Sequence, residues 1–323
     1  MKVKKILAML LAVVLVAALC SCGGKNDTYT VGICQLVQHP ALDAATKGFK
    51  DALTKALGDK VVIDEQNASN DVPACATIVN SFVSKNVDLI MANATPALQA
   101  AASATTTIPI LGTSVTEYGV ALEISDFNGV VGGNISGTSD LAPLSEQAAM
   151  ILELVPDAKN VSLIYCSAEA NSLYQVNVVK AELEKKDVTA TLFPFSDSND
   201  MAAVAEAACA NADAIYVPTD NTVASATGIL DGVVRPKKIP VIAGEEGICA
   251  GCGIASLTID YYDLGYKTGE MAADVLTGKA DISTMKIEYS PNPTKKYNKA
   301  ICDDLGITVP SDYVEIKTAA EGE

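Results

Sequence analysis

The strongest constraint on the fold is a regular alternation of short β-rich runs with longer helical stretches. In the first half of the chain the expected strands cover residues 30–36, 61–66, 89–92 and 108–111. The helical stretches between them cover residues 41–57, 72–85 and 96–105. This order is typical of βαβ units that build a parallel sheet covered by helices, so the first half predicts one α/β lobe.

The second half repeats the same rhythm. Its expected strands cover residues 161–165, 189–193, 214–217 and 241–243, and its helices cover 172–186, 199–210 and 221–233. A chain of 323 residues with 49% hydrophobic residues is long enough to build two medium-sized cores. Two α/β lobes are therefore expected.

Between the halves, residues 117–141 are rich in glycine and contain no long helical pattern, which suits a strand that crosses between lobes. A second crossing is expected near residues 253–260, followed by a helix at 261–276 that returns to the first lobe. The segment 285–313 would then cross back. The predicted first lobe is 30–136 with 259–284, and the predicted second lobe is 137–258 with 285–323.

The N-terminus has the order of an export signal. Three lysines precede an uncharged run of 14 residues, 6–19, which small residues and cysteine follow. A helix that spans a bilayer needs about 20 residues, so this run predicts a signal that is removed. Leu19-Cys20-Ser21-Cys22 resembles the bacterial lipobox, with 1–21 as signal peptide, Cys22 as the lipidated residue and 22–29 as a flexible tether. A cleaved secretory signal without lipid is the alternative.

The net charge of the chain limits the kinds of molecule that it is expected to bind. Removal of residues 1–21 takes away three of the 23 basic residues and no acid, which leaves 20 against 39 acidic residues and a net charge of −19. Phosphate binding needs a basic patch, so nucleic acid is not an expected partner. The acidity favours a soluble monomer, held on the outer face of the cell membrane by its lipid.

Cysteine usage argues against a disulfide framework, because the seven cysteines beyond the signal are an odd number. Cys249 and Cys252 form a C-x-x-C pair that leaves three possibilities open: a local disulfide, half of a zinc site, or two buried thiols. The chain has no second such pair, and its single histidine, His39, is distant in sequence.

Six loops follow the carboxyl ends of expected strands, where open parallel sheets bind ligands. They cover residues 35–40, 93–96, 113–116, 167–172, 218–222 and 244–247, and they are dense in hydroxyls and amides. Helix capping explains any single one of these side chains, but their convergence predicts a site for a small polar ligand. The residues proposed for it are Gln35, His39, Thr95, Thr113, Ser114, Thr138, Ser167, Asn171, Ser172, Thr219, Asp220, Asn221 and Glu245.

Charged ligand groups can be assigned further. Arg235, the only arginine, lies at the far end of a helix, so N–H and hydroxyl groups of 167–172 would hold a ligand carboxylate. An amino group would need an acid, and Asp220 is the first candidate, ahead of Glu245 and Glu246. The alternative for each carboxylate is a capping or solvated role.

Motifs of catalysis are missing from the sequence. It contains no G-x-S-x-G elbow, no phosphate-binding G-x-x-x-x-G-K-[ST] loop and no pair of histidines. We therefore expect no catalytic residue, no metal and no cofactor.

Six blocks are specific enough to compare with known proteins: VGICQLVQHPALDAATKGFKDAL, ANATPALQAA, SGTSDLAPLSEQ, SAEANSLYQV, DAIYVPTDNTVASA and IDYYDLG. They resemble the ABC transporter substrate-binding proteins whose characterised members bind tryptophan or phenylalanine, over about residues 31–310. The resemblance implies a type I periplasmic-binding fold, in which two lobes of parallel sheet and helices, joined by three crossovers, close on a ligand.

The same resemblance implies an aromatic or large apolar amino acid as ligand, and an ABC permease and ATPase as partners. Because the chain has no tryptophan, an aromatic cage would use Tyr118, Tyr165 or Tyr174. A sensory lipoprotein of the same fold remains the alternative function, since receptor and sensor share these features.

Overall fold

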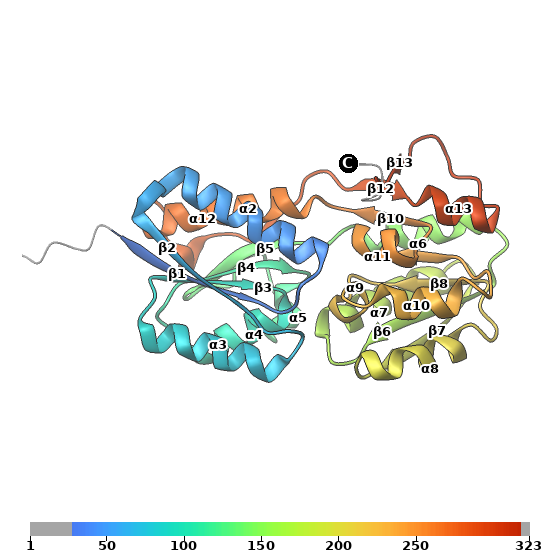
Figure 1. Cartoon of the computed structure of the whole chain (residues 1–323), viewed down its shortest axis with the longest axis horizontal. Coiled ribbons are helices and arrows are strands. Elements are labelled where there is room, and N and C mark those ends of the chain that lie inside the picture. The colour runs from blue at the N-terminus through green and yellow to red at the C-terminus, as the bar shows by residue number, and fades with distance from the viewer. Residues whose placement is uncertain (1–27, 318–323) are drawn as a thin grey trace, which may run out of the picture.

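The computed structural model describes residues 28–317, which form two α/β lobes joined by three chain crossings (Figure 1). The first lobe is built on a six-stranded sheet and the second on a seven-stranded sheet. The expected signal peptide, Cys22 and most of the tether lie outside the described residues. Within residues 28–317, no helix combines the length and apolar character that a membrane crossing requires.

The first sheet has the order β11-β5-β4-β3-β1-β2, and its neighbours pair in parallel. Its strands are β1 (Tyr29–Gln35), β2 (Val61–Asn67), β3 (Leu89–Asn93), β4 (Ile110–Val115), β5 (Ile135–Ser139) and β11 (Glu288–Tyr289). All residues of β3 and β4 are buried, as expected for central strands that are covered on both faces.

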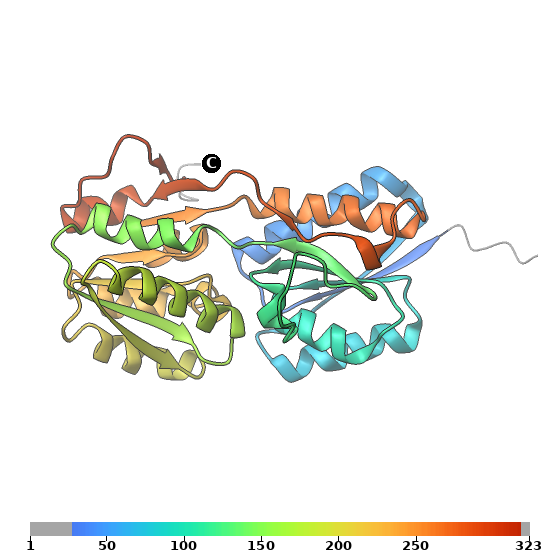
Figure 2. The same cartoon turned by 180° about the vertical axis from the view of Figure 1, so that it is seen from behind.

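Helices cover both faces of this sheet (Figures 1 and 2). Alternate residues of β1 show the two layers: Ile33 packs with Phe49 on one face, and Cys34 packs with Phe82 on the other. The helices of the lobe are α2 (Pro40–Leu57), η1 (Gly58–Lys60), α3 (Val72–Lys85), α4 (Thr95–Ala104), α5 (Tyr118–Ala121), α12 (Tyr261–Leu276) and η2 (Ile282–Thr284).

The second sheet has the order β13-β12-β10-β9-β8-β6-β7 and is parallel except where β10 meets β12. Its strands are β6 (Asn160–Cys166), β7 (Thr189–Phe195), β8 (Ala214–Val217), β9 (Val241–Ala243), β10 (Ala255–Thr258), β12 (Thr294–Tyr297) and β13 (Val314–Glu315). The four strands expected in this half are all present.

Two cores lie on the two faces of the second sheet. Ile151 and Val176 belong to one core, and Met201 and Ile248 belong to the other. The helices are α6 (Leu144–Leu154), α7 (Ala170–Glu184), α8 (Ser198–Ala208), α9 (Asn221–Ala224), α10 (Thr227–Val234), α11 (Glu246–Cys252) and α13 (Lys299–Leu305).

The helix expected at residues 221–233 is two helices. Ala226, between α9 and α10, leaves the helical region with φ −145°. The hydroxyl of Ser225 donates to the carbonyl of Thr222 at 2.9 Å, a local bond that competes with the helical ladder. The break separates the short α9, which faces the first lobe, from α10.

The three crossings run along the same side of the molecule (Figures 1 and 2). They connect β5 to α6, β10 to α12, and β11 to β12. The expected boundaries at 136/137 and 284/285 are wrong by a few residues, because β5 extends to Ser139 and β11 pairs with its end, which places both in the first sheet.

Gly137, just before the first crossing, has a packing role. Gly137 has φ +145°, and a Cβ there would lie 2.1 Å from the carbonyl oxygen of Gly112 on β4. Glycine at this position therefore allows β4 and β5 to approach closely. The irregular segment that crosses follows at residues 140–143.

Candidate functional site

The two lobes touch through loops at the carboxyl ends of their strands. The loops around His39 and Asn221 were predicted from the sequence, and the loop that carries Asn70, after β2, was not. Nε2 of His39, in the loop after β1, lies 3.2 Å from Oδ1 of Asn221 at the start of α9. Nδ2 of Asn70 donates to Oγ1 of Thr222, also at 3.2 Å. The carboxyl ends of the two parallel sheets thus face each other, and α9 is the element of the second lobe that makes both of these hydrogen bonds (Figure 1).

Glu169, which the sequence analysis did not select, orients this contact element. Its side chain is 3% exposed. One oxygen accepts from the backbone N–H and hydroxyl of Thr222 at 2.9 and 2.8 Å, and the other accepts from the N–H and Nδ2 of Asn221 at 3.0 and 2.6 Å. A signal was present in the SAEANS block, where an acid precedes a helix.

The same contacts determine the tautomer of His39. Because Nδ2 of Asn221 donates to Glu169, its Oδ1 faces His39, and Nε2 of the imidazole must carry the proton. Nδ1 of His39 is buried and has no hydrogen-bond partner among the described residues. In the neutral ring this nitrogen is an acceptor.

Asp220, the expected acceptor for a ligand amino group, is a helix cap. Its two oxygens accept from the backbone N–H groups of Cys166 at 2.7 Å and Val223 at 3.0 Å. Burial, and secondarily the neighbouring Glu169, raise the pKa of Asp220 to about 7. The capping alternative therefore describes its contacts better than the ligand role.

Glu245 is also a cap. Its carboxylate accepts from the N–H groups of Gly247 at 2.7 Å and of Ile248, at the start of α11. Burial raises the pKa of Glu245, and the nearby His39 opposes that shift. Glu246, the other candidate acid, forms an ion pair with Lys296 at 2.5 Å.

The remaining candidate site residues of the second lobe are buried in that lobe or form hydrogen bonds within it. Ser167 is exposed, and its hydroxyl donates to the carbonyl of Phe195 at 3.0 Å. Ser172 is fully buried. Thr219 accepts at its carbonyl from Nδ2 of Asn171 at 3.0 Å, while Oδ1 of Asn171 is buried without a partner in the described part of the chain.

In the first lobe, Gln35 is fully engaged. Its Nε2 donates to the carbonyl of Val37 at 2.9 Å and to Asp43 at 2.7 Å, and its Oε1 accepts from Thr46 at 2.6 Å. Asn93, at the end of β3, donates to Leu42 at 2.9 Å, but its buried Oδ1 has no partner within residues 28–317. Gln35 therefore supports the loop.

The candidate threonines of the first lobe are buried in that lobe rather than exposed in its loops. Hydroxyls of Thr113, Thr138 and Thr268 form a buried chain with spacings of 3.2 and 2.8 Å, which ends on the carbonyl of Leu264 at 3.0 Å. Thr95 is buried in the first turn of α4. This chain links β4 and β5 to α12, so it joins the sheet to the second crossing.

Ser114 has the backbone signature of a functional position. Its φ of +53° lies in the left-handed region, which is costly for a residue with a side chain. It sits where the register of β4 and β5 shifts between Gly112 and Val115. Its Oγ is buried and has no partner among the described residues.

Asp140 follows β5 directly at the first crossing, and it was not selected from the sequence. Its Oδ2 accepts from the hydroxyl of Tyr261 at 2.9 Å, whereas its Oδ1 is buried without a partner in the part of the chain that the structure describes. Burial raises the pKa of Asp140, and the nearby side chains of Thr116, Tyr261 and His39 oppose that shift.

Buried polar atoms without partners are rare in folded proteins, so their distribution is informative. Within residues 28–317, five of the six unpartnered side-chain atoms lie on strand ends, loops or a first helical turn at the edge where the lobes meet: His39 Nδ1, Asn93 Oδ1, Ser114 Oγ, Asp140 Oδ1 and Asn171 Oδ1. The sixth, Ser256 Oγ, lies in β10. The interlobe edge thus offers several buried polar atoms that can form hydrogen bonds with a bound molecule.

A pocket of about 640 Å³ opens beside this edge, between the first turns of α2, α11 and α12. It shares Glu245 and Tyr261 with the polar edge, and Pro40, Ala41 and Tyr262 give it an apolar lining. Of the tyrosines expected to form a cage, Tyr118 and Tyr165 are core residues of their own lobes, and Tyr174 is half-buried.

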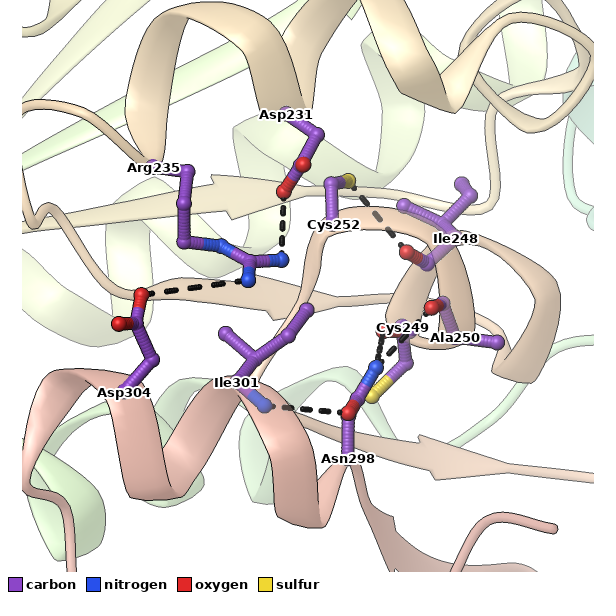
Figure 3. A network of polar contacts seen from close by, with 9 residues as sticks. All are labelled: Asp231, Arg235, Ile248, Cys249, Ala250, Cys252, Asn298, Ile301 and Asp304. Atoms are coloured by element: carbon purple, nitrogen blue, oxygen red, sulfur yellow. Dashed lines mark hydrogen bonds and ion pairs between the residues drawn. The ribbon is translucent and has the colours of Figure 1, made fainter. Parts of the chain in front are cut away.

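The C-x-x-C pair lies on α11 (Figure 3). Cys249 and Cys252 are buried free thiols, and Sγ of Cys252 lies 3.3 Å from the carbonyl of Ile248. The third of the three possibilities is therefore the one observed. No group of three or more metal-binding side chains occurs in residues 28–317.

Arg235 is engaged far from the interlobe edge, as the sequence predicted. Its guanidinium forms an ion pair with Asp231 at 2.7 Å and approaches Asp304 at 4.0 Å (Figure 3). It belongs to the packing of α10 against α13.

Comparisons with known proteins agree over nearly the whole described chain. A family model for ABC transporter substrate binding protein matches residues 30–320. A tyrosine-binding protein of Clostridioides difficile is 38% identical over 300 residues, which cover 86% of each chain.

Two solved structures bear on the arrangement of the lobes. An ABC domain of Streptococcus pneumoniae in complex with L-Trp is 32% identical, with a TM-score of 0.85, and the match covers 90% of this chain and 100% of that chain. The ligand-free, open structure of a Clostridium difficile substrate-binding protein is 38% identical with the same coverage, but its TM-score is 0.69. The better superposition on the less identical, ligand-bound structure agrees with the direct contacts between the lobes. Given the extent of these matches, this chain belongs to the ABC transporter substrate-binding protein family.

Proposed function

We propose that this protein captures an amino acid with a large, preferably aromatic, side chain between its lobes and delivers it to an ABC permease and ATPase. The observation that carries the proposal is the set of unpartnered buried polar atoms at the interlobe edge, which both lobes and the first crossing supply. A pocket of the size that small ligands use lies beside them.

The chemistry of these atoms favours a ligand rich in donors. Asp140 Oδ1, Asn93 Oδ1 and Asn171 Oδ1 are acceptors, Nδ1 of His39 accepts when the ring carries its proton on Nε2 alone, and Ser114 Oγ can donate. A protonated amino group brings three donors, and a carboxylate can accept from Ser114. The hydroxyl of Ser167 is already hydrogen-bonded to the carbonyl of Phe195. Ser114 therefore replaces the 167–172 loop as the proposed hydrogen-bond donor to the ligand carboxylate.

The side-chain preference is supported by the relatives. One is a tyrosine-binding protein and another was solved with L-Trp bound. The apolar lining of the pocket, including Tyr261 and Tyr262, suits the same class of side chain.

The direct test is mass spectrometry of the small molecule retained by purified residues 22–323, followed by calorimetry with the twenty amino acids. We expect tyrosine, tryptophan or phenylalanine to bind with a dissociation constant of about 1 μM or lower. Binding of none of the twenty below about 1 mM would exclude the amino-acid assignment.

The lipid anchor and the position outside the cytoplasm are part of the same proposal and rest on the N-terminal sequence. Cleavage before Cys22 and acylation of its sulfur would hold the lobes at the outer membrane face through residues 22–29. We expect a Cys22→Ala variant to leave the membrane fraction after cell lysis, whereas Cys20→Ala should remain there. A Cys22→Ala protein that still sediments with membranes would show that the anchor lies elsewhere.

A further inference from the structure

Asp140 differs from the other buried acids at the interlobe edge in having an oxygen that nothing occupies. It is 4% exposed, and Tyr261 is bonded to only one of its oxygens. No lysine or arginine in the described chain forms an ion pair with it. A buried carboxylate without a charged partner is costly, so this position is suited to a cation that arrives with the ligand.

The other three acids can be set aside on their contacts. Glu169 and Asp220 use both oxygens on backbone N–H groups at the start of α9 and near it, and Glu245 does the same at the start of α11. Both oxygens of each of these three carboxyl groups are therefore already engaged by the protein. Asp140 alone combines burial, a carboxylate and a free acceptor atom among the described residues.

The location of Asp140 adds a mechanical consequence. It stands at the start of the first crossing, between β5 and α6, and its partner Tyr261 is the first residue of α12, just after the second crossing. The hydrogen bond between them therefore ties two of the three crossings together. A ligand group bound to Asp140 would contact the hinge itself.

On this basis we propose that Oδ1 of Asp140 receives the protonated amino group of the ligand, with Tyr261 as a positioning residue that holds the carboxylate, so that ligand charge is sensed at the hinge. The inference rests on the proposed function and names the residue that selects amino acids over carboxylic acids of the same shape. It replaces Asp220, whose oxygens are engaged in its own lobe.

The test compares each aromatic amino acid with its analogue that lacks the amino group, for example tyrosine with 3-(4-hydroxyphenyl)propionate, by calorimetry at pH 7. The wild type should bind the amino acid about ten- to a hundredfold more tightly, because a desolvated hydrogen bond to a charged group is that strong. Asp140→Asn should reduce this ratio to about threefold or less while it leaves analogue binding nearly unchanged. Asparagine has the same shape and retains an acceptor for Tyr261, so the variant should fold.

Two controls separate a ligand role from a structural one. Asp197→Asn alters an acid of the second lobe that caps α8 and should leave the ratio at the wild-type value. Tyr261→Phe should retain part of the discrimination, because the charge of Asp140 remains. Asp140→Ser provides a second neutral variant, with the same expected loss of the ratio.

The outcomes distinguish the two claims. If the wild type prefers the amino acid and both Asp140 variants keep that preference, the role of Asp140 is wrong and the proposed function stands. If the wild type binds the amino acid and its analogue equally well, the ammonium site is overturned while the proposed function stands. If the wild type binds no amino acid, the proposed function and the ammonium site are both overturned.

Discussion

Buried carboxylates at the lobe interface have two distinct roles. Glu169 and Asp220 accept backbone N–H groups of α9, which presents Asn221 and Thr222 to the first lobe, and Glu245 accepts backbone N–H groups at the start of α11. Such caps satisfy the free donors of a helix start. Asp140 makes no equivalent set of bonds, and its open oxygen makes it available to a ligand.

At this scale the pKa of Asp220 gives a testable pH dependence. Its pKa rises from 3.8 in the unfolded chain to about 7 in the folded protein, mainly because burial disfavours the charged form. The folded state therefore binds the proton more tightly, and stability from this group is complete below about pH 4 and is lost as pH rises through about 7. The shift corresponds to roughly 4 kcal/mol.

Thermal unfolding of the wild type and Asp220→Asn between pH 4 and pH 8 measures this contribution. The variant loses one acceptor for the Cys166 N–H and should be less stable at low pH. The difference in unfolding free energy between the two proteins should shrink as pH rises, because only the wild type has a buried group at this position that must ionise. Parallel curves over the whole range would mean that Asp220 is not protonated in the folded protein at low pH.

At the scale of elements, the pair α2 and α12 joins the N-terminal half of the chain to the segment that returns after the second crossing. A Cβ on Gly265 would lie 1.9 Å from the carbonyl oxygen of Ala45, and one on Gly48 would lie 2.1 Å from that of Tyr262. Glycine on both helices therefore allows the two backbones to touch. This close contact anchors the end of the second crossing in the first lobe.

Gly265→Ala should consequently destabilise the protein by about 3 kcal/mol or more, because the clash is with backbone that cannot move away. Gly232→Ala is the matched control. Gly232 is an exposed helical glycine of α10 with no atom near its added Cβ, and alanine there should stabilise by up to about 1 kcal/mol. Urea unfolding of both variants compares the two, and equal stability would contradict the packing argument.

At the scale of the whole molecule, the lobes touch through His39 with Asn221 and through Asn70 with Thr222. These two contacts are single hydrogen bonds, each worth only about 1 kcal/mol. Without ligand, these two hydrogen bonds therefore stabilise the closed arrangement of the lobes only weakly. Ligand binding between the lobes and at the hinge would supply the remaining free energy.

We expect the ligand-free protein to have a larger radius of gyration in solution scattering than the protein saturated with its amino acid. Asn221→Ala removes the bond to His39 and should weaken ligand affinity by about tenfold or less while the ligand-bound radius stays unchanged. A scattering profile that does not change at saturating ligand would exclude lobe closure as the response to binding.

The sequence by itself determined the two α/β lobes, because hydrophobic periodicity depends only on local order along the chain. Residues 72–85, 214–217, 241–243 and 261–276 form the elements expected of them. The family also followed from the sequence, and the comparisons confirmed it. Open parallel sheets bind ligands beyond the carboxyl ends of their strands, and this rule predicted which edge of the sheets carries the candidate site. It did not predict the roles of single residues at that edge.

Only the tertiary structure decided which polar side chains are already engaged. Asp220 and Asp140 are both acids at the end of a strand, yet one faces backbone donors of its own lobe and the other lies between two crossings with an open oxygen. Hydrogen-bond partners such as Cys166 with Asp220 or Tyr261 with Asp140 are distant in sequence. The packing of the whole chain brings them together, so no local pattern can assign them.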